Sequence, residues 1–225
     1  VCTTILDRGS GALTELVENG RPVSEAELDA YRRAYVEEVA KARLVDRAVL
    51  SSASPEVLRA AEKYPGIVPL LRPRELAKQT ASAVDLLKNV LAALEEKDGY
   101  RPDAVCICYI NAPFRRAGHI DKAIDTMAIF GVDSVISVQE ELSLCYRHGR
   151  HGLTPLNSAR ERAMRLEREA IFKENAAIFL TRTGVIRSGR FLGEKIGHIT
   201  MLPEESVRLS TEFDFWVAEK IASER

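Results

Sequence analysis

The chain has 225 residues, of which 46% are hydrophobic and 29% charged, and this composition is typical of an ordinary globular protein. The length predicts a single domain over residues 1–225, with enough chain to bury a sizeable core. A formal net charge of -1 gives no general attraction to nucleic acid or to an anionic membrane, and no apolar run approaches the roughly 20 residues of a membrane span.

The cysteines predict free thiols in a reducing compartment. Cys2, Cys106, Cys108 and Cys145 all lie in apolar or strand-like settings, and Cys106 and Cys108 face the same way on one strand. The chain offers no second pair that would complete a zinc site, so buried thiols are favoured over metal ligands or disulfides. No signal peptide is recognisable, and a chain that starts without Met can lack native residues. We therefore expect a cytoplasmic protein.

The chain begins with a predicted strand over residues 1–6 and a Gly-rich turn. Backbone N–H groups of such a turn can hold a phosphate, which makes Arg8, Gly9 and Ser10 candidate nucleotide contacts, although a lone Gly-x-Gly is more often just a turn. A helix is predicted over residues 25–43, from an apolar stripe at helical spacing.

Two predicted strands follow, over residues 47–51 and 68–71, with a helix opened by Ser54 and Pro55 between them. The second strand leads into Arg72. This arginine is a candidate ligand contact, and an arginine held by local carboxylates is the equal alternative. An amphipathic helix is then predicted over residues 84–94.

The centre of the chain, residues 102–140, predicts a strand–helix–strand unit. Two short apolar runs, residues 104–109 and 134–138, flank an amphipathic segment that Gly131 ends. Such a unit indicates a parallel strand pair with a right-handed crossover. Because open parallel sheets bind ligands beyond the carboxyl ends of their strands, Asn111 and Arg115, just after the first strand, are candidate site residues.

After Glu140 the strand–helix alternation fails, and we predict an arm at about residues 142–175. Its apolar side chains cannot be buried within an arm, so a second copy of the chain is the simplest cover; they are Leu153, Leu156, Leu166, Ile171 and Phe172. Residues 160–169 alternate in charge, which favours a solvated helix. A nucleic-acid surface is disfavoured because glutamates interrupt the positive charge and no aromatic platform is present.

The chain ends with a strand at residues 198–201 and a helix over residues 211–223. Thr211 and Asp214 are the expected caps of this helix.

These motifs resemble the cytidylyltransferases that make CMP-activated acidic sugars, the CMP-sialic acid synthetases and their relatives. The turn Ile110–Arg115 is similar to the family's Pro-Thr-Ser-Pro-Leu-Arg, and Asp133–Val138 is similar to its Asp-Ser-Val-x-Ser-Val. Arg72–Ala77 resembles Arg-Pro-x-Glu-Leu-Ala, and Glu174–Phe179 resembles Glu-Asn-Gly-Ala-Ile-Tyr. The similarity runs from about Gly20 to Glu219.

The resemblance implies a three-layer α/β/α, Rossmann-like nucleotidyltransferase fold with a mainly parallel sheet and a dimerisation arm. It implies a homodimer, transfer of CMP from CTP to an acidic sugar, and Glu174 and Asn175 as hydrogen-bonding groups near the sugar, with structural use the equal alternative. It also points to the segment Arg208–Ser210, where the family carries the Asp-Ile-Asp that holds Mg²⁺.

The chain departs from the family where ligands would be held. Its first loop lacks the family's lysine, Ala53 replaces an aspartate, Asn111 and Ala112 replace two hydroxyl residues, and Arg208 and Ser210 replace the metal-binding pair. We therefore predict no metal site and no cofactor, with Mg²⁺ relevant only to an active enzyme, and leave the catalytic residues unassigned.

Three functions stay open from the sequence. The first is a homologue with lost or altered catalysis that keeps the fold, the dimer and binding of CTP, CMP or an acidic sugar. The second is an active CMP-sugar synthetase, or a related nucleotidyltransferase, with a rearranged site. The third is a structural dimerisation module without a ligand.

Overall fold

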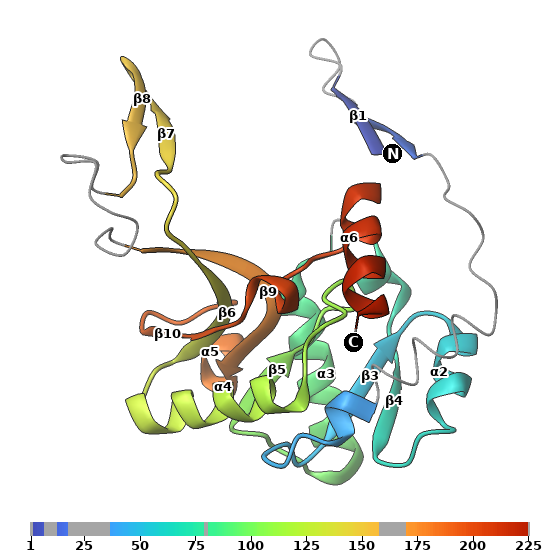
Figure 1. The fold of residues 1–225 in the computed structure, drawn as a ribbon. Coiled ribbons are helices and arrows are strands. Elements are labelled where there is room, and N and C mark those ends of the chain that lie inside the picture. Colours follow the sequence, from blue (N-terminus) through green and yellow to red (C-terminus); the bar gives the residue numbers. More distant parts are fainter. Residues whose placement is uncertain (1, 7–12, 18–36, 79–80, 158–169, 225) are drawn as a thin grey trace.

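The computed structural model of the chain describes residues 2–6, 13–17, 37–78, 81–157 and 170–224 (Figure 1). Its centre is a four-stranded sheet in the order β10-β6-β9-β5. The strands are β5 (Ala104–Ile107), β6 (Ser134–Glu141), β9 (Ile171–Arg182) and β10 (Ile196–Thr200). β10 pairs with β6 in parallel, whereas β9 is antiparallel to both β6 and β5. Strand directions are therefore mainly parallel, as predicted, with β9 alone reversed.

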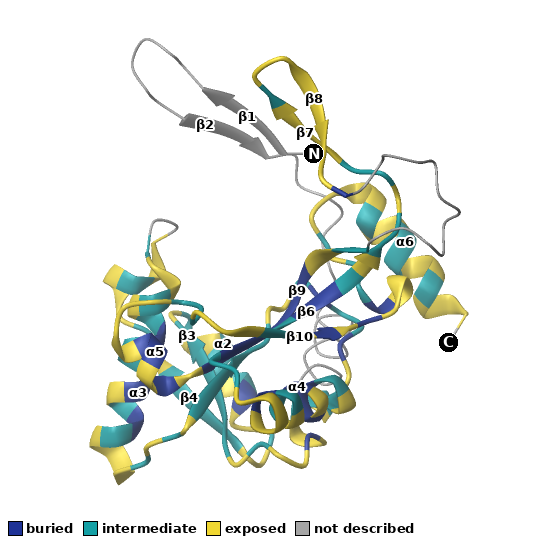
Figure 2. Cartoon of the chain, turned by 90° about the vertical axis from the view of Figure 1, so that its left-hand side faces the viewer, coloured by how far each residue is buried: buried dark blue, intermediate teal, exposed yellow. Residues whose placement is uncertain are grey.

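The expectation that the two central strands pair directly is wrong, because β9 lies between β5 and β6. The reason is burial. Residues 175–181 of β9 are buried without interruption, and a strand buried on both faces belongs inside a sheet with a neighbour on each side. Figure 2 shows the buried stretch of β9 beside β6, whose burial is interrupted by half-buried residues.

Helices cover both faces of this sheet, which confirms the three-layer prediction. α4 (Ala117–Phe130) packs through Ile120, Ala123 and Met127 against Cys106 and Cys108 on one face. α3 (Ala83–Asp98) and α5 (Thr183–Arg187) pack on the opposite face. Their cluster joins side chains from both helices to those of β5 that point away from α4; its members are Leu87, Leu91, Ile186, Val105 and Ile107.

Local signals set the helix ends. Ser82 caps α3 by accepting a hydrogen bond from the Val84 N–H at 3.2 Å. Gly99 and Gly131 end α3 and α4 in the left-handed region, with φ of 69° and 59°. The predicted end at Gly131 is confirmed.

A parallel pair of strands, β3 (Ala48–Ser52) and β4 (Ile67–Leu71), is hydrogen-bonded separately from the four-stranded sheet. α2 (Pro55–Ala61) connects them, and Ser54 caps it as expected. A short 3-10 turn, η1 (Arg74–Ala77), follows β4. Of the predicted helix over residues 25–43, residues 25–36 lie outside the described residues; the helical stretch 37–40 ends before residue 43.

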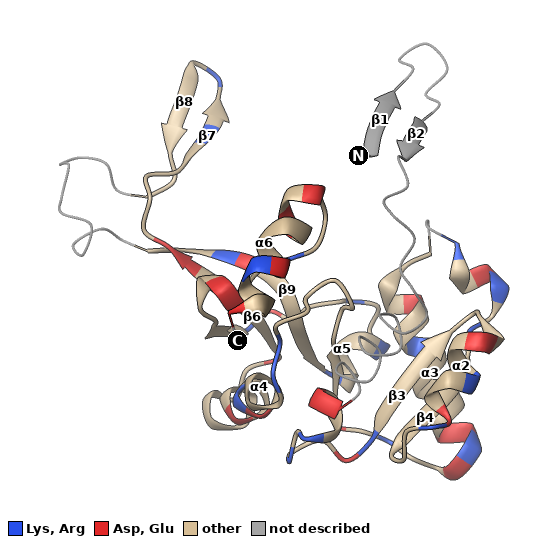
Figure 3. Cartoon of the chain, turned by 45° about the vertical axis from the view of Figure 1, so that its right-hand side comes forward, with Lys and Arg blue, Asp and Glu red and all other residues tan. Residues whose placement is uncertain are grey.

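Two hairpins complete the strands. β1 (Cys2–Leu6) pairs with β2 (Leu13–Val17), and β7 (Tyr146–Gly149) pairs with β8 (Gly152–Pro155). The β7–β8 hairpin projects from the body of the molecule, at the start of the predicted arm (Figure 1). Below it, acidic residues end β6, and Lys173 and Glu174 lie near the start of β9 (Figure 3).

The buried Asn157 fixes the base of this hairpin. Its Oδ1 accepts a hydrogen bond from the Cys145 N–H, and its Nδ2 donates to the Ser143 carbonyl, both at 3.0 Å. Residues 158–169 of the predicted arm lie outside the described residues.

The chain after β10 forms a 3-10 turn, η3 (Pro203–Glu205), and a last helix, α6 (Glu212–Ser223). Thr211 and Asp214 form the predicted capping box of α6. Cys106, Cys108 and Cys145 are free thiols. Within the part of the chain that the structure describes, no helix has the length and apolar character needed to cross a bilayer.

Candidate functional site

The turn that follows β5 meets the segment that precedes α6. The Leu209 N–H donates a hydrogen bond of 2.8 Å to the carbonyl of Asn111, although the two residues are far apart in the sequence. This contact places the segment Arg208–Ser210 against the turn Asn111–Arg115. The structure therefore brings four of the predicted site residues to one edge of the sheet: Asn111, Arg115, Arg208 and Ser210.

Arg115 is buried and fastens the turn to β9. Its Nη1 donates to the carbonyls of Tyr109 and Ala177, at 3.2 and 3.0 Å. Asn111 differs, since its side-chain oxygen is buried and has no hydrogen-bond partner among the described residues. A buried amide oxygen without a donor is costly, and the Asn111 oxygen can accept a donor from a ligand or a water.

Arg208 and Ser210 are exposed. Beside them, the Asp214 carboxylate is committed to the start of α6. Its Oδ2 accepts hydrogen bonds from the N–H groups of Ser210 and Thr211 and from the Thr211 hydroxyl, at 3.0, 2.8 and 2.9 Å. These bonds, above all that from the Thr211 hydroxyl, lower the pKa of Asp214 below its ordinary value.

The residues at this position do not fit a Mg²⁺ ion. Magnesium requires hard oxygen ligands, usually carboxylates. Arg208 contributes a permanent positive charge, Ser210 a neutral hydroxyl, and Asp214 a carboxylate already used as a cap. Among the residues that the structure describes, no group of three or more His, Cys, Asp or Glu side chains is arranged to hold a metal.

Asn175 lies on β9 next to the same segment, but its amide is used within the protein. Its Oδ1 accepts from the Ser137 hydroxyl at 2.5 Å and from the Ala177 N–H at 3.2 Å. Its Nδ2 donates to Ser206 Oγ at 3.0 Å and lies 3.4 Å from the Met201 sulfur. The geometry therefore gives Asn175 a structural role, whereas Glu174 next to it is exposed.

The neighbouring Ala176 has a backbone φ of 56°, in the left-handed region that glycine tolerates and other residues rarely adopt. It lies where the register between β6 and β9 shifts, opposite residues 136–138. The resembled family carries glycine at this position, so this chain keeps a glycine-like conformation with an alanine.

The remaining predicted residues are placed as follows. Arg72 follows β4, and its guanidinium donates to the carbonyl of Ser51 at 2.7 Å and to the Ser51 hydroxyl at 3.4 Å, so among the described residues serine atoms hold it. Arg8, Gly9 and Ser10 lie outside the described residues.

Sequence reasoning missed three polar residues around the site: the buried Ser137 and Glu205 and the half-buried His119. Ser137 could have been identified from the sequence, because a hydroxyl inside an apolar strand needs a hydrogen-bond partner within the protein. The contact of His119 with Glu205 could not have been identified in this way, because the two residues are 86 positions apart in the sequence.

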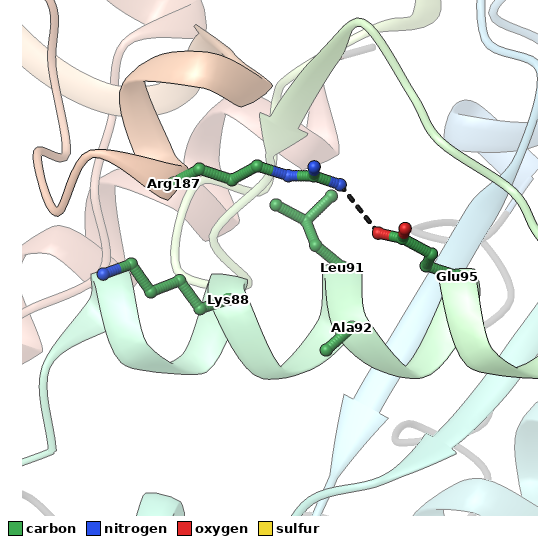
Figure 4. A pocket seen from close by; sticks show the side chains of 5 residues that line it. All are labelled: Lys88, Leu91, Ala92, Glu95 and Arg187. Carbon is green, nitrogen blue, oxygen red and sulfur yellow. Dashed lines mark hydrogen bonds and ion pairs between the residues drawn. The ribbon is translucent and has the colours of Figure 1, made fainter.

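A shallow hollow lies elsewhere, between α3 and the end of α5 (Figure 4). It is lined by Lys88, Leu91, Ala92, Glu95 and Arg187, and an ion pair of 2.9 Å joins Arg187 to Glu95. None of the predicted site residues lines it.

No known family profile matches the chain. The chain is 23% identical over 229 residues to the post-translational flagellin modification protein B of Campylobacter coli, covering all of this chain and 95% of that protein. Among solved structures it resembles a CMP:2-keto-3-deoxy-manno-octonic acid synthetase complexed with CTP, with a TM-score of 0.57, 12% identity, and coverage of 86% of this chain and 88% of that one. The fold is that of the cytidylyltransferases.

Two further structures support this. They are 4-diphosphocytidyl-2C-methyl-D-erythritol synthases, one of them from Anaerococcus prevotii, with TM-scores of 0.57 and 0.59 and 10% identity. They cover 85% of this chain and 86% and 90% of their own lengths. The resemblance to the CMP-acidic-sugar cytidylyltransferases predicted from the motifs is thereby confirmed. Within this cytidylyltransferase fold, the departures at Arg208 and Ser210 stand on the segment that contacts the turn after β5.

Proposed function

We propose that this protein is a cytidylyltransferase homologue that binds a cytidine nucleotide or an acidic sugar at the edge formed by residues 111–115 and 208–210, with lost or altered catalysis. One observation carries the proposal. The Leu209–Asn111 hydrogen bond joins the turn to a segment that carries an arginine where the resembled family has the carboxylates of a metal site, while Asp214 is held in a helix cap.

The chemistry of this edge favours an anion. Arg208 is positively charged at every working pH, and its guanidinium can make two parallel hydrogen bonds to a phosphate or a carboxylate. The same charge repels a divalent cation. Binding of CTP, CMP or an acidic sugar therefore needs no metal at this edge, whereas attack at the α-phosphorus loses the group that would neutralise the triphosphate.

Titration calorimetry with CTP, in Mg²⁺ and in EDTA, tests the proposal. We expect binding of similar affinity in both buffers. Arg208→Ala should weaken it at least about tenfold, because a charge-assisted hydrogen bond contributes roughly 1.5–3 kcal/mol. Arg190→Ala is the matched control, since Arg190 is an exposed arginine paired with Glu194 at 3.1 Å.

The same protein is then assayed for pyrophosphate release with CTP, Mg²⁺ or Mn²⁺ and a panel of eight- and nine-carbon acidic sugars. We expect no sustained turnover. Turnover that Arg208→Ala abolishes would instead identify an active enzyme in which this arginine has a catalytic role. Absence of CTP and sugar binding would favour the structural module.

We also propose a homodimer that involves the arm. Around the projecting hairpin, large apolar side chains are about half or more exposed: Tyr146, Leu153, Leu156 and Phe172. Contact with a second copy would bury them. Light scattering should give twice the chain mass of 25.0 kDa, and a monomer at tens of micromolar, on the order of typical assay concentrations, contradicts the proposal.

A further inference from the structure

A carboxylate and a histidine join the segment before α6 to the start of α4. Glu205 Oε2 lies 3.4 Å from His119 Nε2 and accepts a hydrogen bond of 3.2 Å from the Leu202 N–H. Glu205 Oε1 lies 3.8 Å from Arg116 Nε. Glu205 is 9% exposed, so this carboxylate is enclosed among its partners.

The histidine has a defined tautomer. Its Nδ1 accepts a hydrogen bond of 3.2 Å from the Arg116 N–H, so in the neutral ring the proton is on Nε2, which faces Glu205. Burial lowers the pKa of His119, while Glu205 raises it and Arg116 and Lys122 lower it. The lowered pKa favours the neutral ring, whose Nε2 lies 3.4 Å from the Glu205 carboxylate.

Two further contacts hold the segment 206–210 that follows Glu205. Ser206 Oγ accepts from Asn175 Nδ2, and the Leu209 N–H donates to the Asn111 carbonyl. The segment thus has three attachments to the body of the protein, at residues 205, 206 and 209. Of these, the attachment at Glu205 is the one that reaches α4, which begins directly after the turn 111–116.

We propose that His119 and Glu205 are positioning residues that hold the segment 206–210 in register with the turn 111–116, so that Arg208 faces an anionic ligand. This inference rests on the proposed function. Neither residue contacts the ligand; each acts through the backbone between Leu202 and Leu209.

Two near-isosteric variants each remove one contact of the histidine, either the contact of Nδ1 with the Arg116 N–H or the contact of Nε2 with Glu205. In His119→Asn the amide oxygen replaces Nδ1 and keeps the bond to the Arg116 N–H, but nothing reaches Glu205. In His119→Gln the amide nitrogen replaces Nε2 and keeps the bond to Glu205, but the bond to Arg116 is lost. If His119 only caps the start of α4, His119→Gln should be the more disturbed variant. If His119 positions the segment 206–210, His119→Asn should be the more disturbed variant.

The first readout is hydrogen exchange of the segment 206–210, which needs no ligand. We expect faster exchange at Leu209 in His119→Asn and near-native exchange in His119→Gln. Glu205→Ala should speed exchange at Leu209 as His119→Asn does. If His119→Asn does not fold, Glu205→Ala is measured in its place. Ser134→Ala controls for general loss of stability, since its hydroxyl bonds Thr181 and Gly193 away from this segment.

The second readout is CTP affinity. We expect His119→Asn to raise Kd about tenfold, which corresponds to roughly 1.4 kcal/mol, and His119→Gln to stay within about threefold. Native exchange in His119→Asn, or equal effects of the two variants, would overturn the proposal, as would faster exchange without a change in Kd. If the native protein binds neither CTP nor an acidic sugar, the proposed function fails, and exchange alone decides on the positioning role.

Discussion

Replacing Ser137 by alanine tests how the site is supported from the sheet. Ser137 is fully buried on β6, at the point where the register to β9 shifts. Its hydroxyl donates to Asn175 Oδ1 and accepts a hydrogen bond of 2.8 Å from the Ile178 N–H. The hydroxyl therefore fixes both the bulged backbone of β9 and the amide that holds Ser206.

The expected loss of stability follows from the partners left behind. In Ser137→Ala the Ile178 N–H loses its acceptor in a buried position, whereas Asn175 Oδ1 keeps the Ala177 N–H. One buried group without a partner costs about 1–3 kcal/mol, so we expect the free energy of unfolding to fall by about 2 kcal/mol. For a domain of this size that lowers Tm by roughly 4–8 °C.

Urea or thermal unfolding measures this loss, and Ser134→Ala is the matched control. Ser134 is equally buried on β6, and its hydroxyl pairs with Thr181 Oγ1 at 3.1 Å and accepts from the Gly193 N–H at 2.9 Å. Both variants should lose similar stability, but only Ser137→Ala should also speed exchange at residues 206–210. A loss below about 0.5 kcal/mol, or equal effects on that segment, refutes the reasoning.

Three further predictions follow from the same contacts. Ala176→Val should lower the free energy of unfolding by about 2 kcal/mol or more, measured by urea titration, because a β-branched residue at φ 56° is strained, while Ala176→Gly should change it by less than about 1 kcal/mol. Because the folded-state pKa of His119 is lowered from 6.5, stability should decline as the pH falls below about 6.5, and unfolding midpoints from pH 7.5 to 5 should show less of this decline in His119→Gln. The double change Arg208→Asp with Ser210→Asp should create Mn²⁺ binding, roughly millimolar by calorimetry, and its absence would show that charge at these positions is not what excludes a metal.

Helices were the best predicted part of the fold, because their signals are local. The Ser54 and Thr211 caps and the glycine end at Gly131 each depend on a few neighbouring residues. The order of strands is different, because it depends on which strand is buried on both faces. The apolar run Ala176–Leu180 carried that information, but the similar run of β5 did not reveal that β9 would lie between β5 and β6.

The candidate site could be predicted only where the topology of the sheet sufficed. The carboxyl-end rule located Asn111 and Arg115, because it needs only the end of one strand. The approach of Leu209 to Asn111 and of Glu205 to His119 could not be read from the sequence, since each joins elements that meet only after the sheet and its helices have assembled. Burial of a glutamate is likewise invisible until its partners are placed.

Several side chains in the motifs that this chain shares with the cytidylyltransferases make hydrogen bonds within the protein. The Asp133 carboxylate accepts hydrogen bonds from the N–H groups of Glu194 and Lys195, at 3.2 and 3.0 Å, and Asp214 caps α6. Such residues are held by folding alone, whatever the protein binds. In contrast, Arg208 is exposed, and the Asn111 amide oxygen has no partner among the described residues. The differences at Asn111 and Arg208 thus fall where a ligand could determine the residue, which supports the proposal of lost or altered catalysis, whereas the difference at Ala176 falls at a position where the backbone conformation favours glycine.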